Sequence, residues 1–180
     1  MAQIRGKRVK GTANRQLPIV RKDMLWLIEH KLVIAAFFLL SKCPDEAAQC
    51  CWEVLEHLKE TPHARAHAMC SLTLGQAQYF RGQSDDARFW LVQAVKLGRK
   101  LARTADQPAE LRSCQQAVAQ ASLFLAKLSH EHRVNIPHAH RLLNCAETGF
   151  HRAQFPLGVA LVRQAREEMN VTPSAPIFEC

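Results

Sequence analysis

The stretch that decides the fold is 71–97, SLTLGQAQYFRGQSDDARFWLVQAVKL. It contains two apolar segments separated by Gly82, a residue that readily takes the left-handed backbone conformation ending many helices. Gly75 lies in the first segment and Ala87 in the second, and such small side chains let two helices approach closely. The stretch therefore predicts two antiparallel helices, joined by a short turn and packed together at Gly75 and Ala87.

The same residues resemble a tetratricopeptide repeat (TPR), a helical hairpin that stacks on copies of itself. The resemblance is carried by Leu74, Gly75, Gly82, Ala87, Leu91 and Ala94. It departs from the family pattern at Gln78, where the family carries an aromatic residue, although Tyr79 stands beside it. The resemblance implies stacked hairpins whose concave surface binds a peptide or helix of another protein.

The neighbouring segments repeat this spacing more loosely. Matching residues occur one hairpin earlier, at Ala36, Ala48, Trp52 and Leu55, and one hairpin later, at Ala126, Ala139, Leu143 and Ala146. The offsets are 39 residues from Ala36 to Gly75 and 51 from Gly75 to Ala126, longer than the family's usual repeat of about 34. Such lengthened repeats are similar to those in the sensor domains of LuxR-type regulators. The alternative is a non-repeating helical bundle that contains one such hairpin.

The rest of the chain has the apolar periodicity of helices joined by short turns. We predict helices over 19–41, 44–60, 62–80, 84–103, 109–129, 137–151 and 154–168. Thr61 before Pro62 is a typical cap-then-proline helix start. The predicted fold is all-α: antiparallel hairpins of about seven helices, stacked as a short TPR-like superhelix. We expect a flexible basic arm (1–16), a TPR-like helical domain (17–170) and a disordered tail (171–180).

The composition favours a cytoplasmic helical protein. Hydrophobic residues make up 48% of the 180 residues, and the seven cysteines form no CxxC pair. Scattered cysteines in odd number indicate free thiols in a reducing compartment. The most apolar run, 32–40, has nine residues, whereas a membrane-spanning helix needs about 20. We therefore expect no membrane span.

The net charge of +8 belongs mainly to the N-terminal arm. Seven lysines and arginines precede Asp23, and the remaining 158 residues carry 17 basic and 16 acidic side chains. The arm could be a solubilising tail, could contact nucleic-acid phosphates, or could bind an acidic protein or an anionic membrane. The residues assigned to such a contact are Arg5, Lys7, Arg8, Lys10 and Arg15.

Motifs for chemistry are missing from the sequence, which contains no glycine-rich phosphate loop, GxSxG elbow or HExxH pair. We therefore predict no enzyme activity and no cofactor. His63, His67 and Cys70 would share one helix face, but three ligands on a single helix need a fourth from elsewhere to enclose zinc. We interpret them as surface histidines beside a buried cysteine and predict no metal site.

The predicted function is binding to another protein, as an adaptor within a larger assembly. The groove should lie on exposed faces of the third and fifth helices, with Trp90 as an aromatic anchor. Its predicted residues are Arg65, Gln76, Gln78, Trp90, Gln115, Gln116 and Gln120. The alternative is a nucleic-acid-associated regulatory protein that contacts phosphates through its arm. An apolar end on the first helix would also allow a homodimer.

Overall fold

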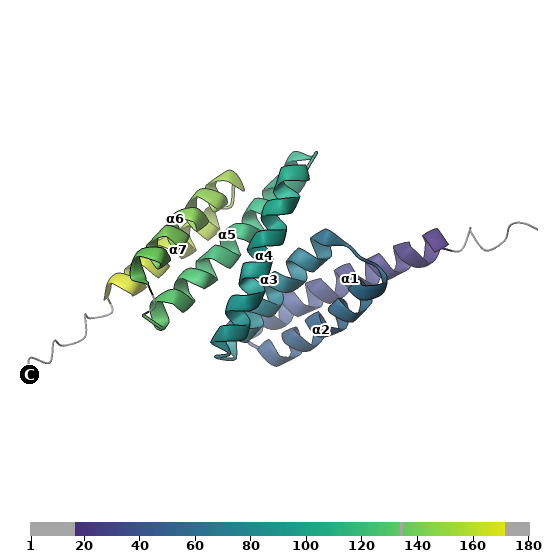
Figure 1. Ribbon diagram of the computed structural model, residues 1–180, viewed down its shortest axis with the longest axis horizontal. Coiled ribbons are helices and arrows are strands. Elements are labelled where there is room, and N and C mark those ends of the chain that lie inside the picture. Colours follow the sequence, from purple (N-terminus) through teal and green to yellow (C-terminus); the bar gives the residue numbers. More distant parts are fainter. Residues whose placement is uncertain (1–16, 134, 172–180) are drawn as a thin grey trace, which may run out of the picture.

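The structure, a computed structural model, describes residues 17–133 and 135–171. Within these ranges the protein consists of seven helices and no strand, which confirms the predicted all-α class (Figure 1). The helices are α1 (Leu17–Leu40), α2 (Pro44–Glu60), α3 (Ala64–Phe80), α4 (Ser84–Thr104), α5 (Pro108–Glu131), α6 (Ile136–Arg152) and α7 (Pro156–Val171). The predicted arm and residues 172–180 of the predicted tail lie outside the described residues.

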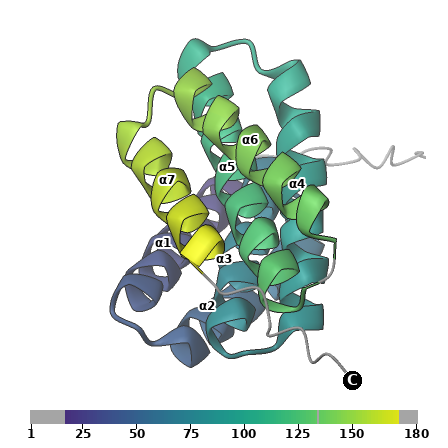
Figure 2. The same ribbon diagram turned by 90° about the vertical axis from the view of Figure 1, so that its left-hand side faces the viewer.

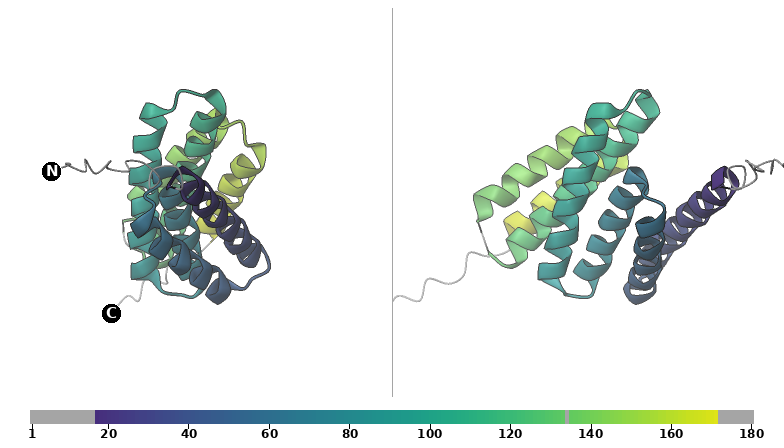
Figure 3. Two further views of the ribbon diagram at one scale, coloured as in Figure 1. Left: turned by 90° about the vertical axis from the view of Figure 1, so that its right-hand side faces the viewer. Right: turned by 45° about the vertical axis from the view of Figure 1, so that its right-hand side comes forward.

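The helices stack in chain order as antiparallel neighbours, and the stack has two layers. The odd-numbered helices also contact one another, α1 with α3, α3 with α5, and α5 with α7. In the part of the chain that the structure describes, the backbones of α2, α4 and α6 do not pack against one another, although the Trp52 ring of α2 contacts the Trp90 ring of α4. Figure 2 looks onto α7 at one end of the stack, and Figure 3 shows α1 at the other.

One type of turn closes a helix at three places. Lys42, Gly82 and Gln154 have φ angles of 60°, 74° and 55°, in the left-handed region. In each turn, the residue that follows the left-handed one donates a 2.9 Å hydrogen bond from its backbone N–H to the carbonyl oxygen of the residue five positions before it. The pairs are Cys43 to Phe38, Gln83 to Gln78, and Phe155 to Phe150. This is the Schellman helix cap. The prediction for Gly82 is confirmed, and two non-glycine residues adopt the same conformation.

The first two hairpins repeat every 40 residues, so the predicted offset of 39 is wrong. Four fully buried residues of the first hairpin stand 40 positions before Gly75, Ala87, Leu91 and Ala94; they are Ala35, Ala47, Cys51 and Val54. The predicted seam residues Ala36 and Trp52 are exposed, Trp52 by 42%. A slip of one residue turns a helix by about 100°, enough to move a side chain from core to solvent. Residues 32–40 of the first helix are apolar on all sides, so their pattern does not mark the buried face.

Two predicted helix starts are also wrong. Thr61 caps the end of α2, and α3 begins after His63, whose Nδ1 accepts a 3.2 Å hydrogen bond from the backbone N–H three residues on. The last helix begins at Pro156 because Gln154 lies in the left-handed turn. In both cases the cap comes later than the residue pattern predicts, and the helical body is unchanged.

The core runs through the stack as three apolar clusters, each formed by three consecutive helices. The clusters combine α1 to α3, α3 to α5, and α5 to α7, so that α3 and α5 each belong to two of them. Between α3 and α4 the packing depends on Gly75, because a Cβ there would lie 2.7 Å from Leu91 Cγ. The close approach predicted for Gly75 is therefore confirmed.

Candidate interaction surface

The C-terminal part of α1, residues 32–40, is apolar on all sides, but α1 contacts the rest of the protein along only one side. Ile28 and Ala35 face the core, where both are fully buried. On its free side Val33 is 70% exposed, Phe37 64% and Leu40 84%. These three side chains are spaced at i, i+4 and i+7 and so share one helix face, which makes the free side of α1 a candidate interaction surface.

A groove runs between α1 and α3, next to this free side, with a volume of about 460 Å³. We call it the α1 groove. It is lined by Glu29, Leu32, Val33 and Ala36 of α1, and by His63, Arg65, Ala66, Met69 and Thr73. The four α1 residues occupy positions i, i+3, i+4 and i+7, which form one helix face. The groove therefore has apolar walls from two helices and charged side chains at its margin.

Two pockets near the α1 groove, one towards the start of α3 and one towards its end, differ in polarity. Towards the start of α3, Glu29, His63 and Arg65 also line an adjoining polar pocket with Glu110. Towards the end of α3, Leu40 and Phe80 line an apolar pocket of about 470 Å³ at the α1–α2 turn. A partner lying along the groove would thus meet polar groups at one end and apolar groups at the other.

The predicted groove residues are not all brought together. Arg65 lines the α1 groove, whereas Gln115 lines a different pocket between α4, α5 and α6. The other glutamines on these helices, apart from Gln78, are partly buried; they are Gln76, Gln116 and Gln120. Trp90 is also partly buried, and its ring packs edge-on against Trp52 and Phe89, at centroid distances of 5.5 and 5.1 Å.

The exposure predicted for Gln78 is wrong, because its side chain is only 3% exposed. Its Oε1 accepts a 3.0 Å hydrogen bond from Arg81 at the end of the same helix. The physical reason is the position of α3, which contacts α1, α2, α4 and α5 and so has little free surface. A polar residue on such a helix is buried with a hydrogen-bond partner rather than exposed to a ligand.

The cluster of His63, His67 and Cys70 has structural explanations. His63 caps α3, and Cys70 is fully buried, with its thiol donating to the Cys51 carbonyl at 3.3 Å. A hydrogen bond with Cys70, together with burial, raises the pKa of the Cys51 thiol, which disfavours the reactive thiolate. Across 17–133 and 135–171, no three His, Cys, Asp or Glu side chains are grouped so that they could hold a metal ion.

Comparison with known proteins adds no identification. A scan against protein-family models found no match, and neither did searches of curated proteins and of solved structures. The TPR resemblance and its LuxR-type variant therefore rest on the sequence of this chain alone. None of the described helices is long and apolar enough to cross a membrane.

The nucleic-acid alternative was assigned to Arg5, Lys7, Arg8, Lys10 and Arg15, which lie outside the described residues and stay a prediction. The free side of α1 was anticipated only as an apolar helix end. Its signal in the sequence is the run 32–40, LVIAAFFLL, which contains no polar position to face solvent. An amphipathic helix of a globular protein would show a polar face there.

Proposed function

We propose that this protein is a TPR-like interaction module that binds an amphipathic helix of another protein in the α1 groove. The observation that carries the proposal is the exposed apolar side of α1 beside that groove. Burying one large apolar side chain contributes about 1.5–3 kcal/mol, so covering this surface would stabilise a complex considerably. The contacts among the odd-numbered helices support the TPR-like interpretation, because stacked hairpins bind partners along one face.

A helix is the partner that fits the groove best. The walls come from α1 and α3, and an apolar helix face inserts into such a cleft through residues at i, i+3 or i+4, and i+7. Glu29 and Arg65 at the polar end would orient the partner through charge complementarity. The partner should therefore have an apolar stripe with charged residues near one end.

A photo-crosslinking amino acid at Val33 of the full chain tests this proposal. The matched control carries the same group at Leu161, an exposed apolar position on α7, at the far end of the stack. We expect the Val33 variant to crosslink one protein through an amphipathic helical segment, and the Leu161 variant to leave that protein unlinked. Equal crosslinking from both positions, or none from Val33, would contradict the proposal.

A second measurement uses the crosslinked segment as a synthetic peptide. Val33→Glu should weaken its binding about tenfold or more, the equivalent of about 1.4 kcal/mol, because a charge then faces the peptide's apolar stripe. Leu161→Glu should leave the affinity unchanged. Both variants should keep the far-UV circular dichroism of the parent protein, since both side chains are exposed.

A further inference from the structure

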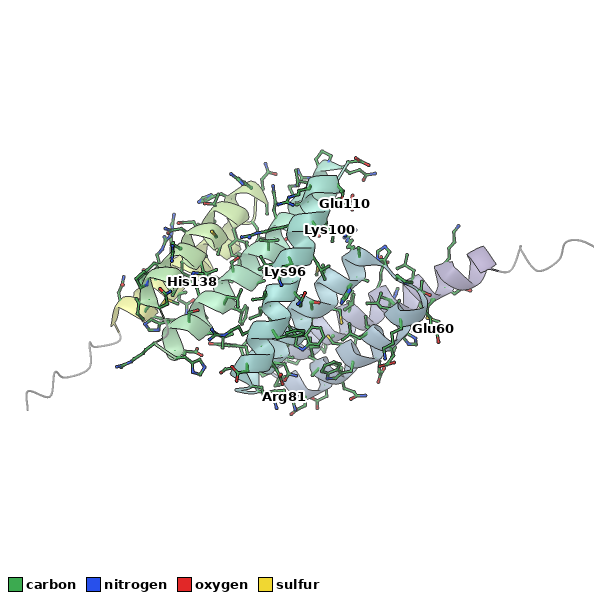
Figure 4. All side chains as sticks on the ribbon, in the orientation of Figure 1. Glu60, Arg81, Lys96, Lys100, Glu110 and His138 are labelled. Carbon is green, nitrogen blue, oxygen red and sulfur yellow. The ribbon has the colours of Figure 1, made fainter. Side chains whose placement is uncertain are left out.

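After residue 22 the charges nearly balance in number, yet they are unevenly placed on the folded protein. The second half of α4 carries Lys96, Arg99, Lys100 and Arg103, all exposed, at positions i, i+3, i+4 and i+7. This spacing puts them on one face of the helix, over about 10 Å of its axis. Figure 4 labels Lys96 and Lys100 along α4, in the middle of the stack.

A pocket of about 460 Å³ lies beside this face, between α4, α5 and α6. We call it the basic groove. Arg99 and Arg103 of α4 and Arg152 of α6 line it, together with the hydrogen-bonding side chains of Gln115, Asn144 and Thr148. No aspartate or glutamate is among its lining residues. Three guanidinium groups thus share one pocket without a carboxylate.

The three arginines form no ion pair within the described residues. Glu147, the carboxylate of α6, is already bound to Arg166 at 2.8 Å. Glu110 at the start of α5 lines the polar pocket with Glu29 and Arg65 instead. The negative end of the α4 dipole acts within its last turn and so accounts for Arg103 at most. Among the residues that the structure describes, no ion pair involves Lys96, Arg99 or Lys100, so pairing within the fold does not explain why these cations share one face.

We propose that the basic groove binds the phosphate backbone of a nucleic-acid strand, independently of base sequence. Arginine matches phosphate oxygens through two parallel N–H donors, and neighbouring amide and hydroxyl groups add further hydrogen bonds. The cations continue along α4 beyond the pocket, which suits a row of phosphates rather than a single one. Such contacts are electrostatic and need no deformation of the helical stack.

A nucleic acid fits these residues better than a phosphorylated peptide. The lining holds no aromatic residue, so it offers neither a stacking platform for bases nor an aromatic anchor for a peptide. The chain also has seven lysines and arginines before its first acidic residue. A run of cations of this kind suits contact with phosphates as well. The groove lies on α4 and α6, away from the α1 groove, so the two proposals fail independently.

The test is fluorescence anisotropy of the full chain with a labelled 20-nucleotide single-stranded DNA at low salt. The groove variant is Arg99→Gln, Arg103→Gln and Arg152→Gln combined. The control variant removes the same charge elsewhere, with Lys42→Gln in the α1–α2 turn, Lys59→Gln on α2 and Arg163→Gln on α7. All six are exposed side chains, so both variants should fold, as checked by circular dichroism.

We expect the groove variant to lose about tenfold or more in affinity, and the control variant less than threefold. The slope of log affinity against log salt should fall by about 2 in the groove variant, since each lost phosphate contact on a single strand removes about 0.7. Equal losses in both variants would overturn the proposal by showing that only total charge matters. An acidic phosphopeptide that outcompetes the DNA in the parent protein would overturn it in favour of a phosphoprotein.

Discussion

At the residue scale, the three left-handed turn residues differ in how well they suit their conformation. Gly82 has no Cβ, whereas Lys42 and Gln154 adopt similar φ angles with full side chains. The left-handed conformation costs an L-residue about 1–2 kcal/mol because Cβ approaches the carbonyl oxygen. The hydrogen bonds of the helix cap must therefore offset this cost at Lys42 and Gln154.

Replacing the glycine at one of these turns by alanine, and a non-glycine residue at another by glycine, should change stability in opposite directions. Gly82→Ala should lower the free energy of unfolding by about 1 kcal/mol, and Lys42→Gly should raise it by about 0.5–1 kcal/mol. Nothing lies within 4 Å of a Cβ added at Gly82, so that loss would be purely conformational. Urea denaturation measures both. A less stable Lys42→Gly variant would contradict the argument.

Tyr79 is the only tyrosine, so its ionisation can be followed directly by absorbance near 295 nm. Burial and the hydrogen bond that its hydroxyl donates to Glu131 raise the pKa of Tyr79 above the ordinary value of about 10. We expect a native titration midpoint above 10, lowered in Glu131→Gln, where burial and the charge of Glu168 still act but the charge of Glu131 is gone. A midpoint in the native protein equal to that in urea would contradict this assignment.

The direction of this pKa shift also fixes its effect on stability. A raised pKa means that the folded protein favours the neutral phenol of Tyr79. The contribution of this phenol to folding stability is therefore fully present below about pH 10. It is lost as the pH rises through the folded pKa. Tyr79→Phe should therefore show a weaker decline of stability with alkaline pH than the parent protein.

At the scale of an element, the contact between α3 and α4 decides whether glycine at position 75 stabilises the protein. In an open helix, Gly75→Ala would stabilise by about 1 kcal/mol through propensity alone. Here the added methyl would lie 2.7 Å from Leu91 Cγ and 3.0 Å from its backbone nitrogen, so the helices must separate. We expect a net loss of about 1–3 kcal/mol in urea denaturation.

The double variant Gly75→Ala with Leu91→Ala separates these effects. Removing the Leu91 side chain relieves the closest clash, so the combined loss should be smaller than the two single losses added together. Additive losses, or a stabilising Gly75→Ala, would show that the helices do not meet at this glycine.

The two sides of α1 should respond differently to substitution. Ile28 is fully buried, so Ile28→Ala should lower the free energy of unfolding by about 2–4 kcal/mol. Phe37 is 64% exposed, so Phe37→Ser should change it by no more than about 0.5 kcal/mol. Chemical denaturation distinguishes the two. Similar losses at both positions would mean that the free side of α1 is covered in solution.

At the scale of the whole molecule, protection against hydrogen exchange should follow position in the stack. The central helices α3 and α5 each contact four others, whereas α1 and α7 each contact two. Because stacked hairpins gain stability from their neighbours, the end helices should open first. We expect faster amide exchange in α1 and α7 than in α3 and α5, by mass spectrometry. Uniform exchange would indicate all-or-none unfolding.

The all-α class, the helix positions and the central hairpin could be predicted from the sequence by itself. These features depend on local signals: apolar periodicity, prolines at helix starts, and glycines at positions 75 and 82 that suit a close contact and a turn. Such signals act within a few residues, and the folded chain keeps them. Exact helix ends depend on weaker capping preferences, which explains the errors at Pro62 and Gln154.

Only the tertiary structure decided which helix faces are free. It buried Ala35 rather than Ala36, because the all-apolar run 32–40 has no polar side to mark its orientation, and it buried Gln78, because α3 lies among four helices. It also brought Arg152 beside Arg99 and Arg103, although more than 45 residues separate them. Charge totals along a chain cannot reveal this gathering, since it arises from the packing of α4 against α5 and of α5 against α6.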